Sequence, residues 1–217
     1  GFDPDGLVTT TASMQDKRYE AAADVNRLFD DTLRTLQRTP GIQSAAISLE
    51  LPYDRLLNLG FRMPDDPDLV RTITNAMYVT PAFLETLRIP LKAGRDLSDR
   101  DRLDSPHVAL VNEAWVRFYS EGRPPIGRRI AILNEERTIV GVMGNVQQMA
   151  SFSLDGLTPG PIVSAPLVLV PIAQTNDAGL RTLHTWFWPV WTVRAASTGI
   201  AADALRDGRL VRLSPLA

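Results

Sequence analysis

VALVNEAWVRFYSEGRPPIGRRIAILNEERTIVGVMGNV, residues 108–146, holds the most regular pattern of the chain. Its first four residues are apolar and rich in valine, which indicates a short strand. Asn112 follows, and its side chain can accept a hydrogen bond from the first turn of a helix that begins at Glu113. Apolar side chains then recur at helical spacing, at Trp115 and Tyr119. This part of the sequence therefore predicts a strand that runs directly into a helix.

The rest of the stretch predicts a hairpin. Gly122 and the prolines after it end the helix, because neither residue type continues one well. Apolar and polar residues alternate over 129–132, polar residues 134–136 form a turn, and apolar residues dominate 138–143. Strand, helix and hairpin in direct succession indicate an α+β fold.

The N-terminal residues predict a β-α-β unit. Residues 7–13 are rich in threonine, which favours a strand. Residues 19–38 combine an apolar stripe with a charged face, as an amphipathic helix does, and Pro40 with Gly41 ends it. Alternation over 42–51 predicts the second strand.

Other elements follow from the same patterns. We expect a strand at 71–79, a short helix at 81–87, a strand at 167–172, a polar connection at 175–183, a strand at 186–195 and a helix at 200–209.

Three segments resemble a known family. They are VTPAFLETLRIPLKAGRDLSDRD (79–101), PHVALVNEAWVRFYSEGRPPIGRRI (106–130) and TIVGVMGNVQ (138–147), and they resemble the periplasmic core domain of MacB/FtsX-type ABC transporter permeases. The opening GFDPDGLVTTTAS and the later LVLVPIAQ are similar to the same family. The resemblance implies two subdomains. Residues 1–52 and 162–217 would form a discontinuous porter-like βαβ subdomain, and residues 53–161 an inserted, mixed α/β Sabre-like subdomain.

The resemblance also implies a function. The chain would be the non-catalytic, extracytoplasmic (periplasmic) part of an inner-membrane permease, and it would couple movement of the transmembrane helices to export or to an envelope partner. Its partners would be those helices, a nucleotide-binding domain or subunit acting across the membrane, and a periplasmic adaptor or a second permease copy. Gly1 and Ala217 would then lie at one end, with residues 112–146 toward the other. The alternative functions are a ligand-sensing module and, third, a hydrolase.

The chemical inventory argues against catalysis. The chain has two histidines, His107 and His184, and no cysteine, so a transition-metal site within one chain is not expected. No serine lies in a G-x-S-x-G elbow, and residues 141–144 lack the Lys-Ser/Thr of a phosphate-binding loop. A formal net charge of −2 gives no footprint for nucleic acid. We therefore expect no catalytic residue, cofactor or metal ion.

Two charged segments have a structural and a functional interpretation. Arg123, Arg128 and Arg129 surround a Pro-Pro-Ile-Gly turn, where an acidic partner could dock, but we favour a structural role in starting the hairpin. Segment 94–101, GRDLSDRD, is similar to a family segment, and we expect a loop held by an Arg95–carboxylate contact.

Carboxylates also gather in the stretch 52–68, among prolines and turn formers. A Ca²⁺ site there would need the ligand order of an EF-hand, which is missing, so we favour a solvated loop.

Aromatic residues gather between Trp186 and Trp191. In a strand, alternation would send Trp186 and Trp188 to one face, and Phe187 and Trp191 to the other. One face would then be core, and the other would be exposed and available to a partner.

Overall fold

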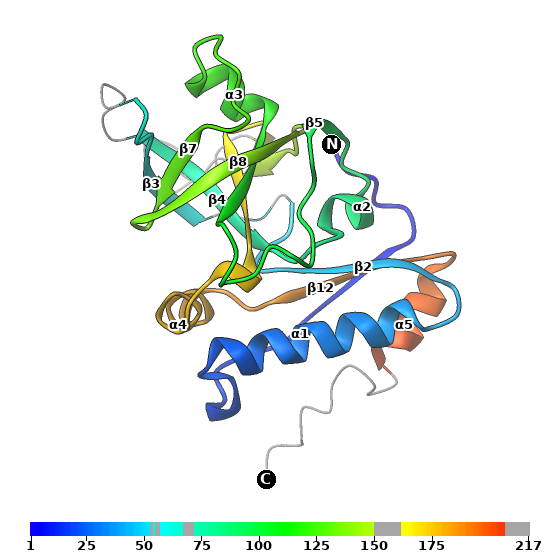
Figure 1. The fold of residues 1–217 in the computed structure, drawn as a ribbon. Coiled ribbons are helices and arrows are strands. Elements are labelled where there is room, and N and C mark those ends of the chain that lie inside the picture. Colours follow the sequence, from blue (N-terminus) through cyan, green and yellow to red (C-terminus); the bar gives the residue numbers. More distant parts are fainter. Residues whose placement is uncertain (53, 55–56, 67–71, 150–161, 207–217) are drawn as a thin grey trace.

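The computed structural model describes residues 1–52, 54, 57–66, 72–149 and 162–206 (Figure 1). Within them the protein has the expected α+β fold, built on one large mixed sheet. Figure 1 shows the sheet in two parts, a rounded upper part and a flatter lower part covered by α1.

The upper part is a closed ring of six strands, called the strand ring below. Its order is β4-β11-β6-β8-β7-β3, and it closes because β3 also pairs with β4. The β4–β11 and β6–β8 pairs are parallel, and the other pairs are antiparallel. The strands are β3 (Leu57–Arg62), β4 (Thr72–Val79), β6 (Val108–Asn112), β7 (Arg129–Ile132), β8 (Glu135–Met143) and β11 (Leu167–Pro171).

One end of the ring is closed by α3 (Glu113–Tyr119). Asn112 caps this helix as the sequence predicts, since its Oδ1 accepts from the amide of Trp115 at 2.8 Å. Trp115 is completely buried and packs against Phe61 of β3, with ring centroids 5.8 Å apart. Tyr119 completes the aromatic cluster, 4.9 Å from Phe61. The pattern in residues 108–119 thus predicted the strand, the helix and its cap.

The lower part is a three-stranded sheet of β1 (Leu7–Thr11), β12 (Val190–Ala195) and β2 (Ile42–Ser48). β12 lies between β1 and β2 and is antiparallel to both, so the predicted β-α-β unit has a C-terminal strand in its middle. α1 (Ala22–Gln37) covers one face through Val25, Phe29 and Leu36.

Helices lie on both faces of that sheet (Figure 1). α5 (Thr198–Arg206) packs against β1 and β12, and α2 (Phe83–Leu87) packs against β2. The two parts join where Ser48 of β2 pairs with Val79 of β4. The remaining short elements are η1 (Lys17–Tyr19), β5 (Leu91–Gly94), β9 (Gln148–Met149), β10 (Ile162–Val163) and η2 (Ile172–Gln174).

The position of β11 bears on the subdomain boundary. The resemblance predicts a return to the porter-like subdomain at residue 162, and β11 pairs with β4 on one side and β6 on the other. It is therefore a strand of the ring.

Two local predictions are wrong. The polar connection expected at 175–183 is the helix α4 (Asp177–Trp186), capped by Asn176, whose Oδ1 accepts from the Gly179 amide. Buried Leu180 and Leu183 hold it on the core, so tertiary packing outweighs the low helix propensity around Gly179. As a result, the strand expected to begin at 186 begins at Val190.

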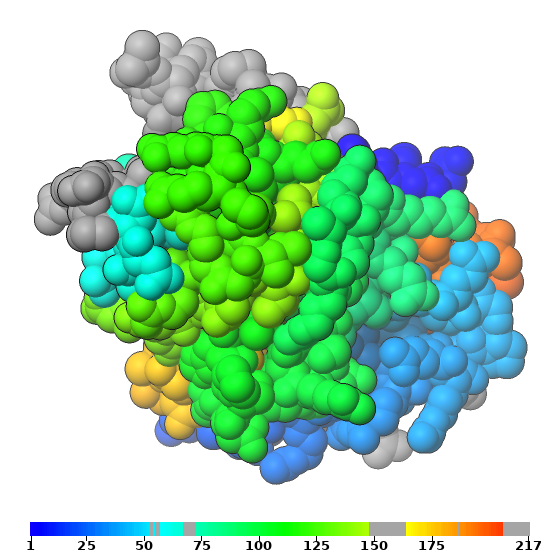
Figure 2. Space-filling model, turned by 45° about the horizontal axis from the view of Figure 1, so that its top comes forward, coloured from blue at the N-terminus to red at the C-terminus, as the bar shows by residue number. Residues whose placement is uncertain are grey.

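The course of the N-terminal segment also differs from expectation. The Gly1 ammonium donates to the Asn145 carbonyl at 2.8 Å, so Gly1 lies beside the region expected at the opposite end. The reason is Arg194, which is buried in β12 and donates to the carbonyls of Asp3 and Asp5. These bonds direct the segment along α2 toward the strand ring, where Figure 2 shows it in dark blue. Ala217 lies outside the described residues.

Candidate functional site

A groove opens at the end of the strand ring opposite α3. It has a volume of about 920 Å³, and its walls come from β3, the β7–β8 hairpin and α4, so we call it the α4 groove. In Figure 2, β3 in cyan and α4 in golden yellow lie on the same side of the ring residues in green. Volume and mixed lining fall in the range of small-molecule sites.

The walls of the α4 groove are mainly apolar. β3 contributes Leu57 and Leu59, and α4 and its C-terminal end contribute Leu183 and Phe187. Gly179 lets the first turn of α4 lie close to Thr175, because a Cβ at this position would come within 2.8 Å of the Thr175 methyl carbon. The Thr175 side chain lines the groove, and within the described residues its buried hydroxyl has no hydrogen-bond partner.

Charged and polar groups line one part of the groove. Arg137 points inward from β8, is 3% exposed, and donates to Glu135 Oε2 at 2.5 Å. The other oxygen of Glu135 accepts from Asn176 Nδ2 at 3.2 Å. Burial lowers the pKa of Arg137, although Glu135 opposes that shift, and burial raises the pKa of the neighbouring Tyr78 to about 12. The cationic and anionic groups neutralise each other.

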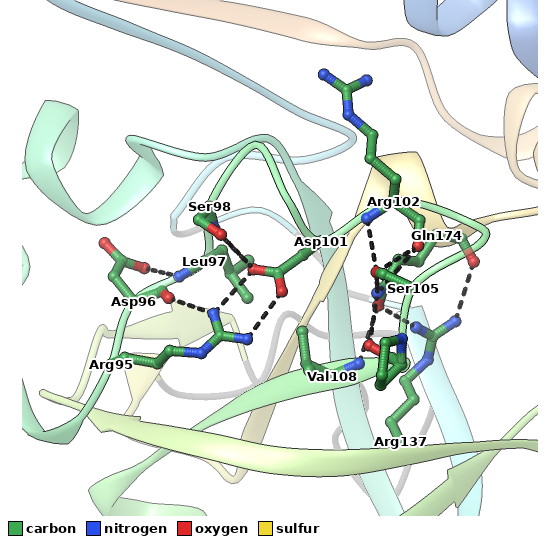
Figure 3. A network of polar contacts seen from close by, with 11 residues as sticks. Arg95, Asp96, Leu97, Ser98, Asp101, Arg102, Ser105, Val108, Arg137 and Gln174 are labelled. Carbon is green, nitrogen blue, oxygen red and sulfur yellow. Dashed lines mark hydrogen bonds and ion pairs between the residues drawn. The ribbon is translucent and has the colours of Figure 1, made fainter.

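Gln174 of η2 holds this arrangement in place. Its side-chain oxygen accepts from the Val108 amide at 2.9 Å and from Arg137 at 3.1 Å. Its amide nitrogen donates to Ser105 Oγ at 3.2 Å and to the Pro106 carbonyl at 3.1 Å (Figure 3). A single buried amide therefore ties β8 and the loop before β6 to the segment that leads into α4.

The segment 94–101 forms the predicted loop. Arg95 donates through both terminal nitrogens to Asp101, at 2.8 and 2.9 Å, which confirms the expected carboxylate contact (Figure 3). Burial disfavours the Asp101 carboxylate, but the bonds from Arg95 and the Ser98 amide outweigh it and lower the pKa. Gly94 has φ +76°, and a Cβ there would lie 2.2 Å from the Val140 carbonyl oxygen, so only glycine fits.

The β7–β8 turn places an apolar residue at the groove in a strained conformation. Leu133 and Asn134 both have positive φ, 51° and 65°, as a two-residue hairpin turn of type I′ requires. Asparagine tolerates this region, whereas leucine does so at a cost. The Leu133 side chain is nevertheless 55% exposed and lines the α4 groove.

The three candidate arginines are paired within the chain. Arg123 and Arg128 both contact Asp66, and Arg129 contacts Asp65 at 2.6 Å and Glu136 at 2.9 Å. Asp65 and Asp66 are therefore ion-pair partners, whereas Asp54 is exposed as expected and Asp68 lies outside the described residues. This arrangement supports the structural interpretation of the arginines, since it fixes the chain after β3 on the start of the hairpin.

The aromatic cluster divides differently from the strand expectation. Trp191 is 4% exposed, donates from Nε1 to Thr32 Oγ1 at 3.0 Å and packs edge-to-face on Phe29, so it belongs to the core. Trp188 is 54% exposed, and Phe187 is partly buried in the groove wall. Trp186 ends α4, and its side chain lies outside the described part.

Sequence reasoning missed the groove. Leu133, Arg137 and Gln174 were not among the candidates, and one signal was present: Arg137 interrupts the inward-facing positions of a strand whose next inward residue, Ile139, is apolar. A charged residue in an inward register position indicates either a partner inside the fold or a site.

Comparison with solved structures shows which protein domains share this fold. Three structures share this fold over nearly the whole chain, and their descriptions name a periplasmic region, an extracellular domain and a domain of a putative permease. The periplasmic region of MacB from Actinobacillus actinomycetemcomitans is 14% identical, with a TM-score of 0.57, 93% of this chain and 81% of that chain covered.

The other two structures share the fold to a similar extent. The extracellular domain of the noncanonic ABC-type transporter YknZ from Gram-positive bacteria is 12% identical, with a TM-score of 0.55 and coverage of 95% and 92%. A domain of a putative permease protein from Porphyromonas gingivalis is 18% identical, with a TM-score of 0.57 and coverage of 99% and 88%. The chain therefore shares its fold with the periplasmic region of MacB, the extracellular domain of YknZ and a permease domain.

The family follows from the sequence. Residues 4–207 match the MacB-like periplasmic core domain, and the chain belongs to that family. No curated protein matches the sequence significantly. Among the described residues, no helix has both the length and the hydrophobicity that a membrane span needs.

Proposed function

We propose that this chain is the non-catalytic extracytoplasmic domain of an inner-membrane ABC permease, and that it transmits movement of the transmembrane helices to export or to an envelope partner. Family membership and the transporter descriptions of the similar structures support this role. A nucleotide-binding domain across the membrane would supply the energy, and an adaptor or a second permease copy would receive the movement.

One observation carries the proposal: the N-terminal segment is attached to both the lower sheet and the strand ring. Arg194 binds it to β12 and also donates to the Thr86 carbonyl of α2 at 2.7 Å. Asp3 pairs with Arg88 at 2.6 Å, and Gly1 contacts Asn145. A displacement applied to this segment would therefore move the sheet and the strand ring together, as one body.

The test uses the full-length permease in membrane vesicles. Spin labels at Lys17, next to α1, and Glu121, beyond α3, would report whether the domain moves as a unit. We expect their distance to stay within about 2 Å between ATP-bound and nucleotide-free states, because packed interiors resist deformation. Meanwhile the distance from Glu121 to a label on a membrane helix should change. A changing intradomain distance would contradict the proposed role.

Contact with a partner is assigned to Trp188 rather than to the whole aromatic cluster. Its exposed indole is the kind of side chain that anchors interfaces. Arg123, Arg128 and Arg129 form ion pairs within the chain, so we propose a structural role for them instead of partner contact.

A second function, ligand sensing or binding without a transport role, is favoured by the α4 groove. The groove offers apolar walls, a neutralised charged pair and a buried hydroxyl without a partner among the described residues. Binding of a small molecule there is compatible with coupling but does not require it.

A further inference from the structure

We propose that the α4 groove binds a small, electrically neutral amphiphile, with an apolar body against Leu59, Leu183 and Phe187 and a hydrogen-bonding head group near Thr175. This inference deepens the second function proposed above and rests on it, while the coupling role does not depend on it. Three independent observations carry it.

The first observation is the shape and lining of the groove. A volume of about 920 Å³ with leucine and phenylalanine walls suits an apolar chain or ring system. Leu59 and Phe187 are only partly buried in these walls, although β3 and α4 both contribute to the core nearby, at Phe61, Leu180 and Leu183. Burial of an apolar ligand there would remove surface of both partners from water.

The second observation concerns charge. Arg137 and Glu135 form an ion pair at 2.5 Å, and Asn176 and Gln174 satisfy further atoms of the two groups. A charged head group would have to break this pair or lie beside the charge of its own sign. A neutral head group avoids that cost. The Thr175 hydroxyl, which has no partner in the described part of the chain, can both donate and accept.

The third observation is Leu133. Its positive φ places a side chain that is 55% exposed at the groove, in a turn position where asparagine or glycine would be less strained. Strained residues concentrate at functional sites, where the strain positions a group. An exposed leucine beside an apolar groove covers a bound apolar body and does little for the unbound fold.

The experiment compares three probes that share an eight-carbon tail: n-octyl-β-D-glucoside, octanoate and octylammonium. Each is added to the 217-residue chain below its critical micelle concentration, and backbone amide resonances are followed by NMR. We expect saturable shifts at residues 57–59, 133 and 178–183 with the glucoside, and at least ~10-fold weaker binding of both charged probes.

Two variants with a matched control locate the site. Ala178→Trp fills the groove from an exposed position, the second residue of α4, and should weaken glucoside binding at least ~10-fold. Ala23→Trp makes the same change at the exposed second residue of α1, outside the groove lining, and should bind normally. Leu133→Asn should weaken binding several-fold while the melting temperature stays the same or rises.

Definite results would overturn the inference. Absence of saturable glucoside shifts, shifts outside the groove, or normal binding by Ala178→Trp would remove the site. Equal binding of a charged probe would remove the neutral ligand class. Either failure leaves the coupling role standing, because that role is measured by the label distances in the full-length permease.

Discussion

The two ends of the strand ring are built differently. At one end, α3 inserts Trp115 against Phe61 and Tyr119, and the aromatic rings fill the space. At the other end, Arg137, Glu135 and Gln174 form a polar network beside the open α4 groove. The closed end resembles an ordinary core, whereas the open end keeps charge and space that a core would eliminate. We therefore propose binding at the open end, beside α4, and expect both ends to contribute to stability.

The largest expected effect tests the closed end. Trp115→Ala removes a completely buried indole and leaves a cavity, so we expect the free energy of unfolding to fall by about 4 kcal/mol. Chemical denaturation measures it. Trp188→Ala, the same substitution at an exposed site, should change stability by less than about 0.5 kcal/mol. Similar losses in the two variants would show that the buried indole of Trp115 stabilises the protein no more than the exposed indole of Trp188.

The next effect concerns acid stability at the open end. His184 is buried in α4, its Nε2 has no partner among the described residues, and burial lowers its pKa from 6.5 to about 4. Between these values the unfolded chain binds a proton that the folded protein excludes. The contribution is therefore complete above pH 6.5 and is lost as the pH falls toward 4, by about 3 kcal/mol.

Denaturation of the wild type and of His184→Leu from pH 7 to 4 measures this contribution. Both proteins lose stability from carboxylate protonation, so the difference between the two curves isolates the histidine. Parallel curves would show that the His184 environment admits the charged form.

A smaller effect tests the polar network. Gln174→Met keeps the length of the side chain but leaves the Val108 amide and part of Arg137 unpaired, which should cost about 2 kcal/mol. Urea titration provides the value. Gln37→Met, at an exposed site on α1, is the control and should be nearly neutral. A neutral Gln174→Met would mean that the network contributes little to stability.

The smallest effect has the opposite sign. Leu133→Asn relieves the positive-φ strain and should stabilise the protein by about 0.5–1 kcal/mol. Leu133→Ala removes the same side chain but keeps the strain, so it should give no gain in thermal unfolding. If both variants are equally stable, the strain at the groove is unimportant and the contrast between the two ends becomes weaker.

Local signals predicted the closed end well and the open end poorly. A few neighbouring residues are enough to predict the strand, the Asn112 cap and the helix that carries Trp115, because a cap and a helical stripe are local features. The α4 groove depends on α4 and β3 meeting across more than a hundred residues of sequence. α4 itself was missed, since Gly179 and polar neighbours conceal a stripe of only Leu180 and Leu183.

Chain topology explains the other differences. The insertion of β12 between β1 and β2, and of β11 between β4 and β6, follows from no local pattern. The paired arginines show the same limit: Arg129 and Asp65 lie 64 residues apart, so sequence alone leaves both charges without visible partners.

The position of β11 also affects how the chain acquires its structure. The ring cannot close until residue 171 is available, because β11 supplies the pairing between β4 and β6. A nascent or partly translocated chain that ends earlier exposes the edges of both strands, which are templates for aggregation. Pairing over such separations is slow, since loop closure precedes the contacts that reward it. Chaperone demand should therefore be highest between the emergence of β6 and that of β11.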